Sequence, residues 1–381
     1  MALINPSQAA SFDQSDVYKL DLSEVLAAIL LDDTDFISVL GVSDQVATQT
    51  KHSWVEDALN ATTFKITNGA LASEATAVGI SSSQLARVTA GTLFKNQLSG
   101  MSEVMQVTAV GAVSATITRG YGATSAQDHL ALATFEIIAH PRPQGMAGPK
   151  DESTVRSLKH NFTQIFSKGV KITGTANSIE HAGVSVEDDY QIDLRLRELK
   201  RELDRTAIMG VRAPNDVDAS TYGTMGGVID FVGWIEAANV NSTAETMTPA
   251  VLNAMALQVY NDGGMPDLLL VGGVQKQKIS AFDAEFRRST LDSRRAGYTV
   301  EEFVTDLGIN LRVVVDRWVP NDVALVLDSS KVKLMPLKGR AFFLEKLGKT
   351  GDSEDWQIVG EYTMEVRNAA QAHAYHSNLK Q

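Results

Sequence analysis

A glycine-lysine-threonine triplet near the C-terminus is the first candidate for chemistry, because such a triplet ends many phosphate-binding loops. The triplet is Gly348-Lys349-Thr350. The loop also needs a glycine five positions before the first glycine of the triplet, and Phe343 stands there instead. The flanking residues predict a strand before the triplet and a polar loop after it, so no helix N-terminus would receive a phosphate. The triplet therefore predicts a surface loop and no nucleotide site.

A second glycine motif, Leu270-Val271-Gly272-Gly273, lies between an apolar run and an expected helix. A dinucleotide-binding turn occupies that kind of position, but it requires the G-x-G-x-x-G spacing, which is missing here. We interpret the motif as a tight turn from a strand to a helix.

Histidines and carboxylates are the remaining candidates for metal ligation or acid–base catalysis. The histidines are His52, His129, His140, His160, His181, His373 and His376. No H-E-x-x-H motif occurs among them. His373 and His376 are three positions apart and could both bind one metal ion, but we expect both to lie in a solvated C-terminal tail. Because adjacent side chains diverge, the paired acids Asp151-Glu152 and Glu301-Glu302 are not poised as acid and base.

The chain also has no G-x-S-x-G motif and no cysteine. A thiol nucleophile, a thiolate metal site and a disulfide framework are therefore excluded. We expect no catalytic residue, no cofactor and no metal site. An α/β enzyme with an accessory β-domain stays an alternative, but it would need a titratable constellation that these residues do not form.

Four clustered arginines stand out: Arg287, Arg288, Arg294 and Arg295. In a loop they could bind carboxylates of another subunit, bind phosphates of nucleic acid, or remain solvated. We favour inter-subunit pairing, because the chain as a whole is acidic and offers many carboxylates to a cationic loop.

Composition limits the class of protein. The chain has 381 residues, with 34 basic and 46 acidic side chains and a formal net charge of −12. The length predicts two or three structural units. An acidic chain without a basic stripe argues against sequence-specific nucleic-acid binding. The first residues lack the features of a secretory signal, and no apolar run is long enough for a membrane span.

A long amphipathic helix, expected over residues 185–210, organises the rest of the chain. Ile192, Leu196, Leu199 and Leu203 recur at steps of four and three, which places them on one apolar stripe. Ser185 is the expected N-cap, and we expect the glycine at position 210 to end the helix in the left-handed conformation. A helix with so narrow an apolar stripe is typical of a long spine helix that packs against β-sheets along one side.

The other elements alternate between β and α/β character. Residues 64–138 predict a small β-barrel or sandwich that contains a hairpin of residues 103–108 and 113–118. Residues 212–335 mix strands with two helices, one of them N-capped by Thr248 and the other expected over residues 274–286. The last strand is expected over residues 361–367. The fold class is therefore α+β.

Several stretches, taken in their order, resemble the major capsid proteins of tailed bacteriophages with the Hong Kong 97 type of fold. The stretches are NFTQIF (161–166), ITGT (172–175), LKREL (199–203), LKGR (337–340), LGKTGD (347–352) and EYTMEV (361–366). The sequence TRGYG (118–122) with His129 resembles the β-domain that one branch of the family inserts in its extended loop. The resemblance covers nearly the whole chain.

This resemblance implies a domain order. Residues 1–50 would form an N-terminal arm, 51–183 an extended loop with the inserted β-domain, and 184–210 the spine helix of a peripheral domain. Residues 211–335 would form an axial domain at capsomer centres, and 336–381 would return to the peripheral domain. The four arginines would then lie in the axial domain, where subunits meet.

The resemblance also implies a function. The chain would be the structural shell protein of a phage head, assembled from hexamers and pentamers around double-stranded DNA that it does not read. Scaffold, portal and decoration proteins would be its partners, with scaffold either a separate chain or already removed. It would be made in the host cytoplasm and found in the virion. An encapsulin-like nanocompartment shell is the alternative of the same fold.

Overall fold

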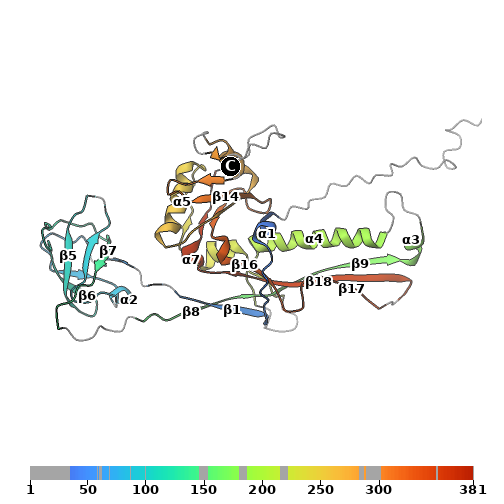
Figure 1. The fold of residues 1–381 in the computed structure, drawn as a ribbon, viewed down its shortest axis with the longest axis horizontal. Coiled ribbons are helices and arrows are strands. Elements are labelled where there is room, and N and C mark those ends of the chain that lie inside the picture. Colours follow the sequence, from blue (N-terminus) through green and yellow to red (C-terminus); the bar gives the residue numbers. More distant parts are fainter. Residues whose placement is uncertain are drawn as a thin grey trace, which may run out of the picture. The chain divides into compact units, whose positions relative to one another are not determined.

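A computed structural model describes residues 35–57, 59, 62–67, 69–85, 87–98, 100–145, 153–179, 187–214, 222–282, 287–288, 302–348 and 351–380. The chain divides into two compact units (Figure 1). The main unit consists of Met1–Trp54 and Lys159–Gln381, and the inserted unit is Val55–Leu158. The inserted unit therefore interrupts the main unit once, within the region expected to form the extended loop.

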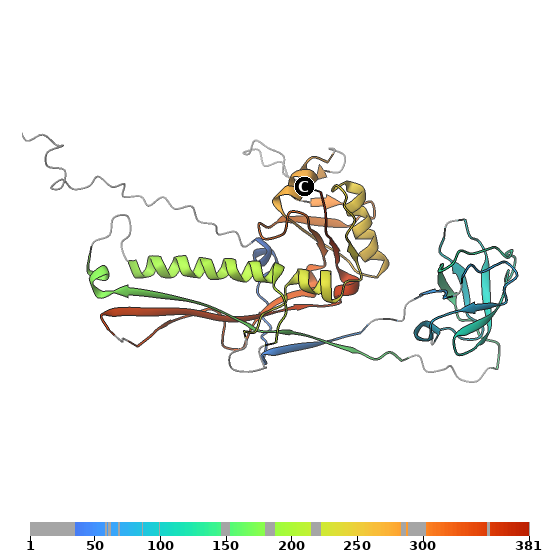
Figure 2. The ribbon, with the colours of Figure 1, turned by 180° about the vertical axis from the view of Figure 1, so that it is seen from behind.

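The main unit is built along one long helix, α4 (Glu187–Met209). It lies along two antiparallel strands, β9 (Gln164–Thr173) and β18 (Ser353–Val366), in both views of the ribbon (Figures 1 and 2). Acidic residues fill the first turn of α4, where the helix dipole favours negative charge. No helix in the described part of the chain is long and apolar enough to cross a membrane.

The expected apolar stripe of α4 faces the core over half of its length. Leu199 and Leu203 are buried in the main cluster, while Ile192 and Leu196 pack against the same cluster and stay partly exposed. Leu199 and Leu203 are more buried than Ile192 and Leu196 because helix α1 (Asp35–Leu40) also contacts the second half of α4. The expected N-cap, Ser185, lies outside the described residues.

The glycine that ends α4 has a different role from the one expected. Gly210 is absent from the glycines with positive φ among the described residues, so the prediction of a left-handed cap was wrong. A Cβ atom at Gly210 would instead lie 2.4 Å from the carbonyl oxygen of Met225 and 2.5 Å from that of Thr206. The position requires glycine because the chain passes close to another backbone segment there.

Among the described residues, β18 is the centre of a four-stranded sheet. β16 (Val332–Pro336) and β17 (Phe343–Lys346) pair with one edge of β18, and β9 pairs with the other edge. A short helix, α3 (Gly174–Ser178), follows β9. β1 (Lys51–Glu56) and β8 (Ser157–Phe162) form a separate two-stranded sheet at the two ends of the inserted unit.

A second sheet, of seven strands in the described part, carries the α/β character. Its order is β10 (Val240–Asn241), β19 (Ala374–His376), β15 (Ala324–Leu327), β11 (Leu268–Val271), β14 (Asn310–Val315), β13 (Glu302–Val304) and β12 (Arg287–Arg288). Its helices and helical turns are η2 (Asp230–Ile235), α5 (Pro249–Asn261), α6 (Gly273–Ser280), η4 (Ser329–Lys331) and α7 (Ala369–Ala372). The side chain of Thr248 caps α5, as predicted. α6 ends earlier than expected, and residues 283–286 lie outside the described residues.

The C-terminal histidines are not in a solvated tail, and that prediction was wrong. His373 and His376 are fully buried, because β19 inserts between β10 and β15. Burial lowers the pKa of His373 to about 4, so its ring is neutral, and its Nδ1 accepts a hydrogen bond from the backbone of Asp328. The end of the chain therefore completes the seven-stranded sheet, and only residues up to the end of β18 return to the sheet beside α4.

The inserted unit is a β-structure with its own core. Its sheet, as far as the structure describes it, has the order β2 (Thr63–Lys65), β7 (Thr134–Ala139), β4 (Leu93–Asn96), β5 (Val104–Val110), β6 (Ser114–Thr118) and β3 (Ala77–Gly79). An antiparallel bridge of Ile66 with Ile80 joins the first and last strands, and α2 (Ser82–Leu85) follows. The predicted hairpin is confirmed as β5 and β6. The rings of Phe64, Phe94 and Phe135 meet in the core.

Candidate functional site

The N-terminal segment is anchored to the main unit through helix α1. Phe36 is fully buried in the same apolar cluster as Leu199 of α4. The backbone N–H of Phe36 donates to Asp316 Oδ2 (3.2 Å), and that of Ile37 donates to Asp204 Oδ1 (2.9 Å). The buried side chain of Phe36 and two carboxyl groups therefore hold the start of α1.

The two carboxyl groups share a buried site, and this decides their protonation. Asp204 and Asp316 are both fully buried. Burial, together with the hydrogen bond and charge of Asp316, raises the pKa of Asp204 to about 8, although the N–H of Ile37 opposes the rise. Asp204 Oδ2 accepts no hydrogen bond among the described residues, so it can carry the proton that faces Asp316. At neutral pH the anchor therefore contains Asp204 as a protonated carboxylic acid.

The chain after α1 continues along the four-stranded sheet. Val42 and Ala47 form parallel bridges with Leu334 and Leu337, and the N–H of Ala47 donates to the carbonyl of Pro336 at 2.9 Å. Residues 36–47 are therefore an integral part of the main unit.

Buried polar contacts fix the strands that lead to and from the inserted unit. Asn161 of β8 is fully buried and donates to the carbonyls of Gly226 (3.0 Å) and Met364 (2.7 Å). His52 of β1 lies 3.3 Å from Glu365. Burial alone would raise the pKa of Glu365, but hydrogen bonds from His52 and Arg367 offset it, and the pKa is lowered. The carboxylate therefore stays charged.

The inserted unit holds a buried ion cluster around Glu103. Arg119 donates through Nε and Nη2 to the two carboxylate oxygens, each at 2.7 Å, and His129 Nε2 lies 2.9 Å from Oε2. The N–H groups of Gly120 and Gln127 complete the set at 3.0 and 2.9 Å. Burial would raise the pKa of Glu103, but these donors lower it to about 2. This cluster closes the TRGYG turn onto β5 and is structural.

The arginine cluster is only partly placed. The backbones of Arg287 and Arg288 form β12, which pairs with β13 at the edge of the seven-stranded sheet. Their side chains, and all of Arg294 and Arg295, lie outside the described residues. Their pairing with another subunit stays a prediction.

Metal binding is not indicated in the described part of the chain. No group of three or more histidine, cysteine or acidic side chains could hold a metal there. Sequence reasoning missed the pair of Asp204 and Asp316. One signal was available, because an aspartate directly after Leu203 borders the apolar stripe of α4, where an unpaired charge is unfavourable.

The comparisons with known proteins identify the family. A family model described as SU10 major capsid protein matches residues 6–380. The chain belongs to the SU10 major capsid protein family. The major capsid protein of Escherichia phage Phieco32 is 24% identical over an alignment of 275 residues, and the match covers 59% of this chain and 77% of that protein. The cyanophage A-1(L) capsid asymmetric unit contains a chain of the same fold, with a TM-score of 0.58 and 11% identity over 98% of this chain and 100% of the other.

The resemblance to phage major capsid proteins and the mixed α+β fold are thereby confirmed. This SU10-type major capsid protein is a structural protein of the virion and not an enzyme. Its subunits form a capsid shell. The alternatives of a nanocompartment shell and of an α/β enzyme are not supported by the family match.

Proposed function

We propose that this capsid protein assembles as hexamers and pentamers into the head shell around double-stranded DNA. The observation that carries the proposal is the unburied apolar edge of the main unit. All four residues of β17 are exposed, among them Phe343 and Leu344, and Leu347 follows with 40% of its surface accessible. In the described part of the chain β17 pairs only with β18, so its other edge is open. Neighbouring subunits would cover such an edge.

The domain roles follow from the same proposal. Residues 1–50 act as an arm that is fixed to its own main unit at residues 36–47. Residues 51–183 act as the extended loop and 211–335 as the axial domain. The cluster of Arg287, Arg288, Arg294 and Arg295 pairs with carboxylates of the neighbouring subunit. The net charge of −12 supports a shell that holds DNA without adhering to it.

The partners and place of assembly are part of the proposal as well. Scaffold, portal and decoration proteins join the shell, and assembly takes place in the host cytoplasm. Many weak, repeated contacts between identical subunits are enough to close such a shell.

Negative-stain electron microscopy with light scattering tests the proposal. Closed particles, or rings of subunits, are expected for the purified protein or for the protein co-expressed with its scaffold. The paired change F343D/L344D should leave monomers of unchanged circular dichroism, because a charged edge strand repels its neighbour. Lys338→Asp is the matched control, because it makes the same change of net charge at an exposed position outside β17. A wild-type protein that stays monomeric with scaffold present would contradict the proposal.

A further inference from the structure

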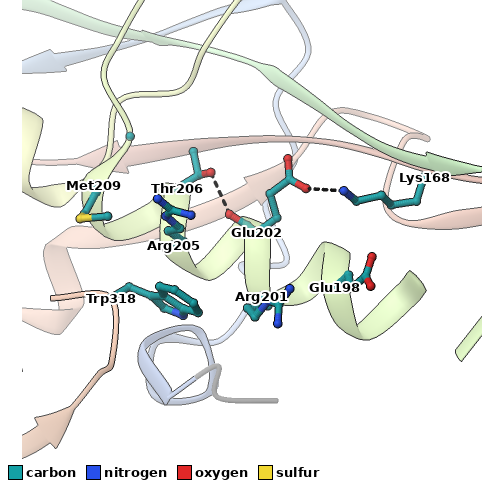
Figure 3. A pocket seen from close by; sticks show the side chains of 9 residues that line it. Lys168, Glu198, Arg201, Glu202, Arg205, Thr206, Met209 and Trp318 are labelled. Atoms are coloured by element: carbon teal, nitrogen blue, oxygen red, sulfur yellow. Dashed lines mark hydrogen bonds and ion pairs between the residues drawn. The ribbon is translucent and has the colours of Figure 1, made fainter. Parts of the chain in front are cut away.

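A hollow of about 630 Å³ lies on the main unit, beside the second half of α4. Arg201 and Arg205 line it from successive turns of the helix, Lys168 lines it from β9, and Trp318 forms another wall (Figure 3). We call this hollow the arginine groove. It lies within one unit, so its shape depends on that unit alone.

The charges of the arginine groove are not balanced. Glu202 is neutralised by Lys168 at 3.4 Å, and Glu198 by Arg195 at 2.6 Å. For Arg201 and Arg205, no carboxylate lies within ion-pair distance in the described part of the chain, although Arg205 stacks 5.6 Å from the ring of Trp318. The groove therefore presents two guanidinium groups and an aromatic face, which suits an acidic segment with apolar neighbours.

The start of α1 lies next to this groove. Asp316 accepts the N–H of Phe36 and, through its other oxygen, the N–H of Trp318 at 2.8 Å. Asp204, which holds Ile37, directly precedes Arg205 in α4. Asp316 and Asp204 therefore connect the start of α1 directly to the residues that line the arginine groove.

The segment that precedes α1 has the matching chemistry. Residues 1–34 contain six acidic side chains and one lysine. Asp33 and Asp32 stand two and three positions before Asp35, so at most about 10 Å of extended chain separates them from it. Leu30 and Leu31 precede them. No other segment of the sequence is both acidic and tied so closely to the groove.

We propose that residues 30–33 dock into the arginine groove of their own chain, with Asp32 and Asp33 paired to Arg201 and Arg205 and the leucines on Trp318. This docking is independent of the shell contacts proposed above. It folds the N-terminal segment back onto its own subunit and covers two cations that would otherwise be available to a neighbour.

Thermolysin cleavage within residues 28–31 of the unassembled full-length protein tests the docking, with products identified by mass spectrometry. R201E/R205E should raise the cleavage rate about fivefold, because proteolysis follows the population of the undocked segment. D32R/D33R should do the same. The variant that combines all four changes should return to within about twofold of the wild-type rate, because the ion pairs are re-formed in reverse.

R197E/K200E is the matched control, since it makes the same change of charge on α4 outside the groove, and its cleavage rate should equal that of the wild type. A wild-type rate for R201E/R205E, or a failure of the combined variant to restore protection, would overturn the proposal. A cleavage rate that falls as protein concentration rises would overturn it too, since that result assigns the groove to the segment of a second copy. None of these readouts requires shells to form, so they remain valid if the proposed assembly fails.

Discussion

Asp204 and Asp316, which are far apart in the sequence, accept hydrogen bonds from the backbone N–H groups of two consecutive residues, Ile37 and Phe36. Both carboxyl groups are buried, and one of them must hold a proton for the pair to be stable. The packing of helix α1 on the main unit is therefore coupled to pH through the proton that the two carboxyl groups share.

The stability of the main unit should fall as the pH rises. The pKa of Asp204 is 3.8 in an ordinary environment and about 8 in the folded protein, so only the folded state holds this proton between those values. The resulting stability is fully present below pH 3.8 and is lost as the pH approaches 8. Urea midpoints followed by fluorescence across this range measure the effect. All four tryptophans, Trp54, Trp234, Trp318 and Trp356, lie in the main unit and report on it alone.

Asp204→Asn should flatten this pH dependence, because an amide keeps the oxygen that serves Ile37 and offers a permanent N–H to Asp316. Asp193→Asn is the control, since Asp193 is exposed on the same helix. If Asp204→Asn and the wild type show the same slope against pH, the shared proton is not the cause.

Phe36→Ala should destabilise the main unit by about 4 kcal/mol, the usual cost of emptying a fully buried phenylalanine site. Denaturant unfolding by tryptophan fluorescence measures this loss. Val46→Ala is the control in the same segment, because Val46 is 44% exposed and little packing is lost. Equal stabilities of the two variants would show that α1 is not docked as described.

Glu103→Gln should destabilise the inserted unit by about 3 kcal/mol or more, since Arg119 would keep a buried charge without its partner. Hydrogen exchange of β5 and β6 measures the loss, and tryptophan fluorescence of the main unit should not change. Because the pKa of Glu103 is lowered from 4.5 to about 2, its stabilisation is present above pH 4.5 and disappears as the pH falls through 2. Unchanged exchange in Glu103→Gln would contradict the ion cluster.

Gly210→Ala should cost about 2 kcal/mol, because the added methyl group would meet two carbonyl oxygens that belong to packed backbone. Gly273→Ala is the matched change in α6, where a Cβ atom meets nothing within 4 Å, and it should be neutral or stabilising. The difference in thermal midpoint between the two variants measures the close approach. A stabilised Gly210→Ala would mean that the position tolerates a side chain.

The elements predicted correctly are those whose signals are local. The four-residue steps of Leu199 and Leu203 predict α4, the side chain of Thr248 predicts the start of α5, and alternation with a turn predicts the hairpin of β5 and β6. Each of these signals comes from residues that lie close together in the sequence.

The features that sequence reasoning missed are non-local. His373 and His376 looked like tail residues, because nothing near them indicates that β19 pairs with β10 and β15. The role of Gly210 depends on the carbonyl of Met225, and the anchor depends on Asp316, a residue that no spacing rule connects to Asp204. Tertiary contacts decided these positions, and periodicity does not report tertiary contacts.

The pairing of β9 with β18 determines the order in which a newly made chain can fold. The inserted unit is complete in sequence once residue 158 has been translated. β9 follows at once, but its partner, Ser353–Val366, can pair with it only after residues 174–352 have also been translated. The main unit, with its open strand edge on β17, therefore finishes folding only after β18 has been made.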